Sequence, residues 1–159
     1  MAQVHASCVL LARAGEAFGA PADAGVLLLG ESGSGKSDLA LRLIERGAVL
    51  VSDDRTELFA EAGALIAAPA KGLVGLIEVR NLGILELPHA DTARVHLAVH
   101  LSDNPAARLP EPEFYEPPEA LMLDREAQPP LLRLSAKEPS APAKIVAAAA
   151  AHTQALFRT

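Results

Sequence analysis

One short segment of the chain has residue types suited to binding nucleotide phosphates. It reads Gly30-Glu31-Ser32-Gly33-Ser34-Gly35-Lys36-Ser37 and matches the pattern G-x-x-x-x-G-K-S in full. Small residues let backbone N–H groups turn inward around phosphate oxygens, and the start of a following helix adds partial positive charge. Lys36 is then expected to reach the β- and γ-phosphates, while Ser37 offers its hydroxyl to Mg²⁺. The segment therefore predicts binding of ATP together with Mg²⁺.

The residues on both sides of this segment support the interpretation. Residues 25–29 are continuously apolar, which is typical of a strand covered on both faces. From Ser37 onward, apolar and charged residues recur with the period of a helix of roughly three turns, which Gly47 ends. Residues 48–52 are apolar again and predict a further strand. The order strand, glycine turn, helix, strand predicts an α/β domain.

Two adjacent carboxylates follow this last strand. Asp53 and Asp54 lie 17 and 18 residues after Lys36, at the kind of strand end where open α/β sheets place their chemistry. One carboxylate can bind or orient the metal shell, while the other accepts a proton from an attacking hydroxyl. Because neighbouring side chains of an extended segment point to opposite sides, we expect different roles for the two. The alternatives are a solvated turn after the strand, or an aspartate that caps the next element.

A second unusual segment covers residues 75–84, where Glu78 and Arg80 interrupt an otherwise apolar run. Buried charges need partners or metals. Glu78 is therefore a candidate for completing the Mg²⁺ shell through water, and Arg80 is a candidate for pairing with Glu78 or facing phosphate. The alternative is an edge strand whose polar side faces water.

The rest of the chain is expected to belong to the same domain. Residues 103–118 are acidic and turn-rich, and nine of the twelve prolines lie between Pro105 and Pro142, so we expect an ordered or semi-ordered excursion there. The further predicted elements are strands at 4–11, 94–101, 121–123 and 131–134, a hairpin of 56–60 with 64–68, a loop at 12–24, and a C-terminal helix at 141–157.

Composition excludes several classes of protein. With 159 residues, half of them hydrophobic, the chain is expected to form a single domain over residues 1–159. A net charge of −6 and 3% aromatic residues argue against a nucleic-acid surface. The single cysteine, Cys8, excludes an internal disulfide and a multi-cysteine zinc site, and its apolar strand predicts buried packing. No apolar run is long enough to span a bilayer, and no secretory signal is legible, so we expect a cytoplasmic protein.

The motifs of other phosphate-loop classes are missing from the sequence. A small GTPase would need an Asn-Lys-x-Asp base-reading motif, and no Asn-Lys pair occurs. A transporter ATPase would need a Leu-Ser-Gly-Gly-type segment, which is also absent. A nucleoside monophosphate kinase would need an arginine-rich lid, but the arginines are scattered. The phosphate loop must therefore be interpreted together with the carboxylates and residues 75–84.

Taken together, these segments resemble the catalytic domain of the HPr kinase/phosphorylase family, bacterial enzymes that act on a serine of the phosphocarrier protein HPr. The matching segments are the phosphate loop, Arg46-Gly47, Val51-Ser52-Asp53-Asp54 and, most strongly, Leu76-Ile77-Glu78-Val79-Arg80-Asn81-Leu82-Gly83-Ile84, which is similar to the family's Glu-Ile-Arg-Gly-Leu-Gly-Ile signature. The spacing from Lys36 to Asp54 and to Glu78 also fits. The resemblance implies a core similar to that of phosphoenolpyruvate carboxykinase, with added β hairpins and a C-terminal helix, and a homo-oligomer that is often a hexamer.

The resemblance also implies which residues bind the nucleotide and the metal. Residues 30–37 bind ATP, with Lys36 on the phosphates. Ser37 and Glu78 hold Mg²⁺, and Asp53 belongs to the same metal site.

The same resemblance implies a set of catalytic residues that includes Lys36. Asp54 is the general base for the substrate serine, and the general acid when phosphate attacks phosphoserine. His5, within His5-Ala6, resembles the family's histidine and supports the site. Arg108 is the candidate for a later arginine near the transferred phosphoryl group.

Two departures from the family pattern shape the expected activity. The usual N-terminal domain has no counterpart, so we expect a short form of the enzyme. The family's late Arg-Pro-Gly-Arg-type segment, tied to phosphorolysis, has only residues 137–144 as its nearest counterpart. The sequence therefore predicts a Mg-ATP-dependent protein-serine kinase with weak or absent phosphorolysis, acting on an HPr-like carrier of a bacterial phosphotransferase system and regulating carbon or nitrogen metabolism. The alternative is a nucleotide-binding sensor in which Asp54 is idle.

Overall fold

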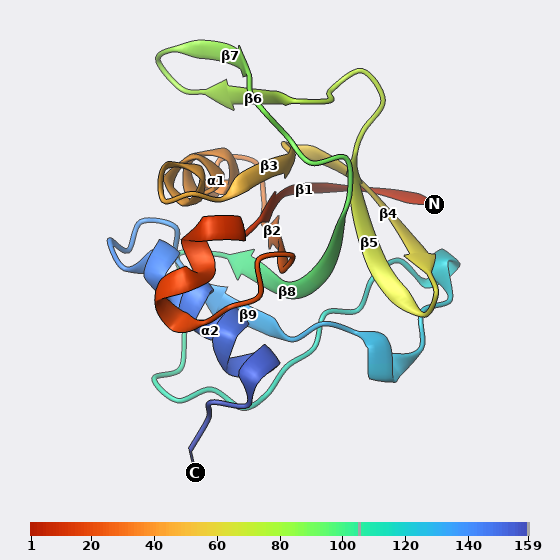
Figure 1. The fold of residues 1–159 in the computed structure, drawn as a ribbon, viewed down its shortest axis with the longest axis vertical. Coiled ribbons are helices and arrows are strands. Elements are labelled where there is room, and N and C mark those ends of the chain that lie inside the picture. Colours follow the sequence, from red (N-terminus) through yellow and green to blue (C-terminus); the bar gives the residue numbers. More distant parts are fainter. Residues whose placement is uncertain (105, 159) are drawn as a thin grey trace.

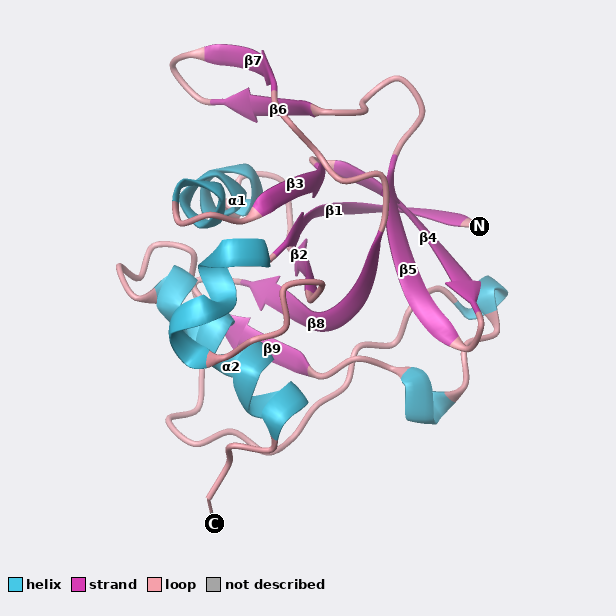
Figure 2. Ribbon diagram, in the orientation of Figure 1, coloured by secondary structure: helices cyan, strands magenta, loops and turns pink. Residues whose placement is uncertain are grey.

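A mixed β-sheet with two α-helices makes up most of the structure, and a two-stranded hairpin stands apart from the sheet (Figures 1 and 2). The computed structural model describes residues 1–104 and 106–158. Pro105, within the predicted acidic excursion, and Thr159, at the end of the predicted domain, lie outside the described residues. The predicted α/β class is confirmed.

The order of elements follows the prediction closely up to the hairpin. The main sheet contains β1 (Ala2–Leu10), β2 (Gly25–Leu29), β3 (Val49–Ser52), β4 (Arg55–Glu61), β5 (Ala64–Pro69), β8 (Ala93–Leu101) and β9 (Leu131–Leu134). The separate hairpin consists of β6 (Leu76–Val79) and β7 (Gly83–Glu86). The helices are α1 (Lys36–Glu45) and α2 (Ala141–Gln154), and short 3₁₀ helices span Ala12–Phe18, Glu119–Leu121 and Arg125–Ala127.

Two long strands, β1 and β8, each belong to two parts of the sheet. The beginning of β1 pairs with β4, whereas its later residues lie between β2 and β3. β8 begins antiparallel to β5 and continues parallel to β2 and β9. Because β2 also pairs with β8, the pairings β2-β1-β4-β5-β8 form a closed circuit and the sheet curls around its own inner face.

Apolar cores lie on both faces of this curled sheet. Alternate residues of β2 contribute to each: Val26 and Leu28 pack toward the helices, and Leu27 packs into the inner core. The prediction that residues 25–29 are covered on both faces is therefore confirmed. The helix-side core also contains Leu39 and Leu43 of α1 and Ile145 of α2, and the inner core contains Cys8, Val51, Leu58 and Leu65.

The strand directions bring several loops to one edge of the sheet. β2 and β3 are both antiparallel to β1, which lies between them, so the ends of β2 and β3 meet at the same edge. Ala6 pairs with Leu29, and Cys8 pairs with Ser52. The phosphate loop after β2, the Asp53 turn after β3 and the middle of β1 therefore lie side by side. The predicted strand–helix–strand unit exists, but an antiparallel strand separates its two strands.

Some predicted elements differ from the structure. The strand predicted at 121–123 is wrong: Glu119–Leu121 form a 3₁₀ helix and Met122 has φ 53°. Prolines at 117 and 118, which have no N–H to donate, precede this segment and disfavour strand pairing. The predicted loop at 12–24 contains a 3₁₀ helix, and α2 stops before its predicted end because Ala155 adopts φ 53°. In the described ranges, no helix combines the length and apolarity that a membrane crossing requires.

Candidate active site

The phosphate loop connects the end of β2 to the start of α1, and its glycines are required by close approaches. A Cβ at Gly30, where φ is 150°, would lie 2.5 Å from the Ser34 hydroxyl oxygen. A Cβ at Gly35, where φ is 98°, would lie 2.7 Å from the Cβ of Ala136. Both conformations favour glycine. By contrast, a Cβ at Gly33 would meet nothing within 4 Å, so no neighbouring atom packs against this part of the loop.

Lys36 is folded over its own loop. Its Nζ donates hydrogen bonds to the carbonyl oxygens of Gly30, at 2.7 Å, and Glu31, at 2.9 Å. Burial lowers the pKa of Lys36, because a low-dielectric surrounding disfavours the ammonium form, while the charges of Asp54 and Asp53 act in the opposite direction. The lysine therefore lies at the centre of the loop, between the loop carbonyls and the carboxylates after β3.

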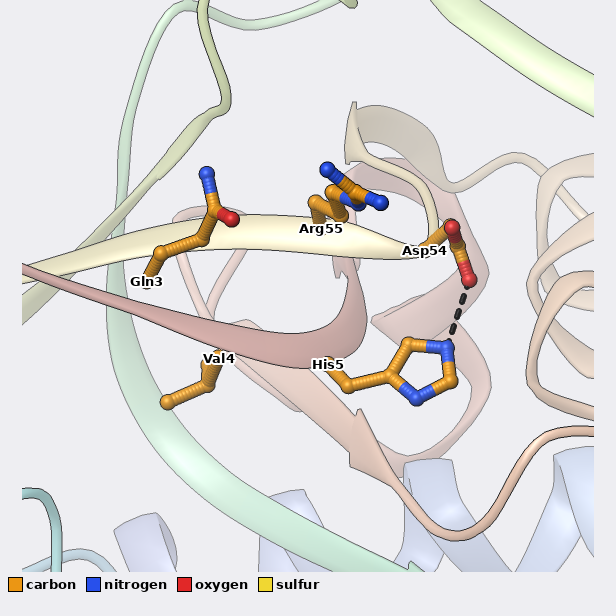
Figure 3. A pocket seen from close by; sticks show the side chains of 5 residues that line it. All are labelled: Gln3, Val4, His5, Asp54 and Arg55. Atoms are coloured by element: carbon orange, nitrogen blue, oxygen red, sulfur yellow. Dashed lines mark hydrogen bonds and ion pairs between the residues drawn. The ribbon is translucent and has the colours of Figure 1, made fainter.

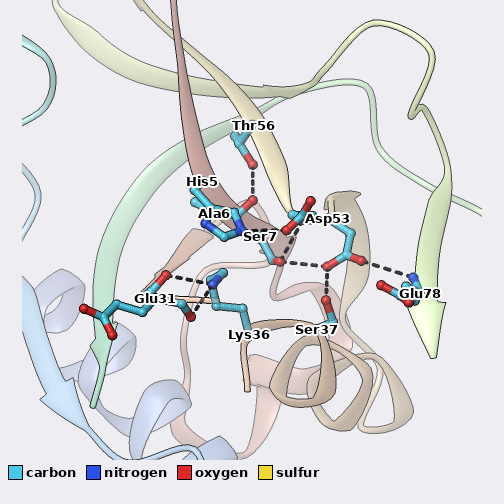
Figure 4. Close-up of polar contacts among 11 residues, drawn as sticks. His5, Ala6, Ser7, Glu31, Lys36, Ser37, Asp53, Thr56 and Glu78 are labelled. Atoms are coloured by element: carbon cyan, nitrogen blue, oxygen red, sulfur yellow. Dashed lines mark hydrogen bonds and ion pairs between the residues drawn. The ribbon is translucent and has the colours of Figure 1, made fainter. Parts of the chain in front are cut away.

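Asp53 connects four elements through one buried carboxylate (Figure 4). Its Oδ1 accepts hydrogen bonds from the hydroxyls of Ser7 on β1 and Ser37 on α1, each at 2.7 Å. Its Oδ2 accepts the backbone N–H of Glu78 on β6 at 3.1 Å. Asp53 thus ties the phosphate loop, the turn after β3 and the hairpin to one another.

Asp54 faces the other way, as predicted, but it lies in a bend after β3 and not in the extended segment that the prediction assumed. Its backbone adopts φ 66°, a conformation that few residues other than glycine adopt. The side chain is 58% exposed, and its Oδ1 lies 2.6 Å from Nε2 of His5, which is 47% exposed. The backbone N–H of Asp54 donates to the Ser7 hydroxyl at 3.1 Å. The result is an accessible carboxylate paired with a histidine beside the phosphate loop.

These groups line a cleft of about 480 Å³ between the phosphate loop and the hairpin. Its lining comprises His5, Ser32, Gly33, Gly35, Lys36, Ser37, Asp38, Leu41, Asp54, Glu78, Val79, Arg80 and Asn81. A smaller hollow of about 280 Å³, lined by Gln3, Val4, His5, Asp54 and Arg55, lies beside it (Figure 3). The two hollows share only His5 and Asp54.

The structure brings most of the predicted site residues together. His5, Lys36, Ser37, Asp54 and Glu78 all line the cleft, and Asp53 lies beneath it. Glu78 is exposed to solvent, as the alternative of a polar strand face in water predicted. It also lines the cleft, as its candidate role requires.

Arg108 lies apart from this group. It is exposed in the loop after β8 and is not among the residues that line the cleft. Its role near a transferred phosphoryl group stays a prediction.

Sequence reasoning missed Ser7, which is fully buried and contacts both aspartates. The signal was present in part, because Ser7 is two residues after His5 and so shares its face of β1. A serine in an apolar strand otherwise gives no sign of its partner. Asn81, which has φ 70° in the hairpin turn, stands where the family signature has glycine, and asparagine is one of the few residues that adopts this conformation readily.

The loop and its neighbours fit a nucleotide with Mg²⁺. The buried Ser34 hydroxyl has no hydrogen-bond partner in the part of the chain that the structure describes, and Lys36 Nζ contacts only carbonyl oxygens. Within residues 1–104 and 106–158, no three His, Cys, Asp or Glu side chains gather as a metal site. Mg²⁺ commonly takes one or two protein oxygens and completes its shell with phosphates and water. The Ser37 hydroxyl, with Asp53 behind it and Glu78 across the cleft, suits that mode.

Comparison with known proteins agrees with the fold. The family model "HPr Serine kinase C-terminal domain" matches residues 20–111, which is more than half of the chain. The chain belongs to this family. The solved structure of the Hpr(Ser) kinase/phosphatase from Coxiella burnetii has the same fold, with a TM-score of 0.73, 23% sequence identity, and coverage of 98% of this chain and 93% of that chain.

Curated relatives match only a part of the chain. The HPr kinase/phosphorylase of Streptococcus pneumoniae (strain Hungary19A-6) is 41% identical over 87 residues, covering 50% of this chain and 28% of that protein. The HPr kinase/phosphorylase of Streptococcus thermophilus (strain ATCC BAA-491 / LMD-9) is 47% identical over 64 residues, covering 40% and 21%. The chain thus spans between a fifth and a third of the length of these relatives.

Proposed function

We propose that the chain is a Mg-ATP-dependent protein-serine kinase that phosphorylates an HPr-like phosphocarrier protein of a bacterial phosphotransferase system. One observation carries the proposal. Asp54 presents an exposed carboxylate to the cleft, 2.6 Å from His5 and beside Lys36 of the phosphate loop. A nucleotide-binding module needs the loop but has no use for an accessible, oriented carboxylate next to it. Membership in the HPr Serine kinase C-terminal domain family supports the assignment, and we propose that the chain acts in the cytoplasm.

The geometry supports a simple division of roles in transfer. The serine oxygen of the carrier forms a bond to the γ-phosphorus of ATP, the bond from that phosphorus to the β–γ bridging oxygen breaks, and ADP leaves. Asp54 takes the proton of the serine hydroxyl, and His5 holds the Asp54 carboxylate in place. Lys36 neutralises charge on the β- and γ-phosphates. The Ser37 hydroxyl and Glu78 would hold Mg²⁺, with Asp53 behind Ser37, and the ion would supply further neutralisation of phosphate charge.

The ion pairs of two late lysines support transfer from ATP to the carrier over the reverse reaction with phosphate. Lys137 forms an ion pair with Asp103 at 2.8 Å, and Lys144 forms one with Glu138 at 2.7 Å. Neither lysine lines the cleft. We therefore propose that phosphorolysis of the phosphorylated carrier is weak. Incubating serine-phosphorylated carrier with phosphate and Mg²⁺ tests this, and rapid formation of pyrophosphate would contradict it.

By family resemblance, we also propose that the chain forms a homo-oligomer, with a hexamer as the expected state and a role in regulating carbon or nitrogen metabolism. Light scattering coupled to size-exclusion chromatography measures the mass directly. A mass equal to that of one chain at the concentrations used for activity assays would contradict the oligomer.

Replacing Asp54 by asparagine tests the proposed function. General-base assistance commonly contributes about 10²–10⁴-fold to a rate. Asp54→Asn should therefore lower single-turnover transfer from ATP to the carrier by about that factor, whereas equilibrium ATP binding should change little. Asp23→Asn, an exposed aspartate outside the cleft, is the matched control. Wild-type transfer rates in Asp54→Asn would exclude Asp54 as the base. Tight Mg-ATP binding without transfer by the wild-type chain would favour the sensor instead.

A further inference from the structure

The smaller hollow beside the cleft has a location that suits the acceptor. It lies against the beginning of β1 and β4, and Figure 3 shows the Gln3 and Arg55 side chains on the same side of this strand pair. Residues of the phosphate loop line the larger cleft, and none of them lines the smaller hollow. His5 and Asp54 form the boundary that both share.

In-line phosphoryl transfer requires the attacking and leaving oxygens on opposite sides of the phosphorus. Because the phosphate loop holds the nucleotide from one side, the serine oxygen must arrive at Asp54 from the other. The smaller hollow borders Asp54 and is lined by no residue of the phosphate loop, which makes it the candidate space for that approach. We propose that this hollow receives the serine-bearing segment of the acceptor protein, an inference that rests on the proposed kinase function.

The chemistry of the hollow indicates what it recognises. Arg55 is exposed and has no ion-pair partner within the described ranges, although a guanidinium offers five N–H donors. The amide of Gln3 donates to Glu57 at 3.1 Å and keeps its other N–H available. The edge of the hollow is thus rich in donors around a single carboxylate. It suits backbone carbonyl oxygens of a protein segment, next to a serine whose hydroxyl reaches Asp54.

Steady-state kinetics with an HPr carrier and ATP test this assignment. Loss of a hydrogen bond to a charged group corresponds to roughly a 10- to 100-fold effect. Arg55→Ala should raise the KM for the carrier by about 10-fold or more and leave the KM for ATP unchanged, with Arg55→Lys intermediate. Arg125→Ala, in an exposed 3₁₀ helix outside both hollows, is the matched control and should behave as wild type.

The outcomes separate the two levels of the proposal. Transfer by the wild-type chain with an unchanged carrier KM in Arg55→Ala would overturn the acceptor hollow and leave the kinase function intact. An equal rise in both KM values would also overturn it, because the arginine would then act on the whole site. Absence of transfer by the wild-type chain would overturn the kinase function and this inference with it.

A different observation carries a second inference, on Ser7. Its single hydroxyl proton is donated to Asp53, so the oxygen is left to accept the N–H of Asp54. Ser7 therefore links the two aspartates by hydrogen bonds. The N–H that it accepts belongs to Asp54, whose backbone has φ 66°. Backbone in sparsely populated conformations persists when its surroundings hold it. We infer that Ser7 is a positioning residue that fixes the direction of the Asp54 carboxylate.

Double substitution distinguishes positioning from general damage. Small misplacements of a reacting group cost up to about 100-fold in rate. Ser7→Ala should lower carrier phosphorylation by about 10- to 100-fold with ATP binding unchanged, and Ser7→Thr should restore most of the rate. In an Asp54→Asn background, Ser7→Ala should cause no further loss, because residues acting as one unit are non-additive. Wild-type activity in Ser7→Ala, or the same loss in both backgrounds, would overturn the inference.

Discussion

The two walls of the cleft are built in different ways. The phosphate-loop wall rests on the helix-side core, where Leu39 and Leu43 of α1 are fully buried. The hairpin wall carries exposed apolar side chains, with Leu82 69% and Ile84 71% exposed. Only Ile77 of the hairpin strands is fully inside the core, at 1% exposure. One wall is therefore part of the domain's core, and the other is attached to it.

The attachment of the hairpin wall has a specific polar component. The backbone N–H of Glu78 donates to Asp53, the same carboxylate that accepts the Ser37 hydroxyl. Segments with few buried contacts open locally at lower free energy than the global core. Phosphate binding and the placement of the hairpin therefore depend on different contacts, and the hydrogen bonds of Asp53 connect the two walls.

Removing the lysine of the rigid wall should have the largest effect. Lys36→Ala deletes the charge expected at the β- and γ-phosphates, so phosphoryl transfer should fall by about 10³-fold or more and ATP binding should weaken. The circular dichroism spectrum should remain that of the wild type, because the loop is held by its glycines and by α1. Full transfer activity in this variant would refute the assignment of the loop.

Matched truncations should show the difference in packing directly. Leu39→Ala empties a fully buried site and should lower the free energy of unfolding by about 2–5 kcal/mol. Ile84→Ala changes an exposed side chain and should alter it by less than about 0.5 kcal/mol. Urea denaturation measures both. Equal losses would show that the hairpin is as firmly packed as the phosphate-loop wall.

Removing the hydrogen bonds of Asp53 should make the hairpin wall more mobile and leave the phosphate-loop wall unchanged. Asp53→Asn replaces Oδ2, the acceptor of the Glu78 N–H, or Oδ1, the acceptor of two hydroxyls, by an NH₂ group that cannot accept. We expect faster hydrogen exchange at β6 and β7, unchanged exchange in α1, and transfer lowered by roughly 10- to 100-fold. Unchanged exchange in the hairpin would mean that Ile77 alone anchors it.

Reaction with a thiol reagent should distinguish the buried sheet from the exposed hairpin, with the smallest effect on the protein itself. Burial raises the pKa of Cys8 from 9.0 to about 12, so the folded chain keeps the unreactive thiol form at neutral pH. Cys8 should react with a thiol reagent only on the time scale of unfolding, whereas a cysteine placed by Ile84→Cys should react at once. Rapid labelling of both would erase the contrast.

The same burial predicts a pH dependence of stability. Because the thiol ionises more readily in the unfolded chain, the Cys8 contribution to stability is complete below about pH 9 and is lost as pH rises toward about 12. Cys8→Ala should remove this component of the alkaline decline, which denaturation at several pH values measures. An identical decline in Cys8→Ala and wild type would show that other groups cause it.

The parts of the site that could be predicted are those whose chemistry needs particular residues in local order. The phosphate loop required its glycines for backbone conformation, and Lys36 and Ser37 followed from that motif. The different directions of Asp53 and Asp54 were predicted from strand geometry, but the structure produces them through a bend in which Asp54 has φ 66°. Glu78 could be predicted because it is a charged residue within an otherwise apolar run. Each of these signals is contained in one short segment of the chain, so no tertiary information was needed to find it.

The remaining features depend on pairing between distant segments. The insertion of β1 between β2 and β3 brings Ser7 to Asp53 across 46 residues, and no pattern in either segment announces it. The closed circuit of strands depends on β8 changing partners along its length. The 3₁₀ helix at Glu119–Leu121 occurs where the apolar residues alone predicted a strand. In these places, tertiary context rather than local preference decides the structure.

The contribution of β9 and α2 to the helix-side core has a consequence for synthesis of the chain. The helix-side core that supports the phosphate loop is completed by Leu134 on β9 and Ile145 on α2, about a hundred residues after the loop itself. Pairings between distant segments form slowly, and incomplete chains leave apolar faces uncovered. During synthesis, part of the apolar surface of β2 and α1 therefore stays uncovered until β9 and α2 have been made. The loop acquires its final support only after those two elements have packed.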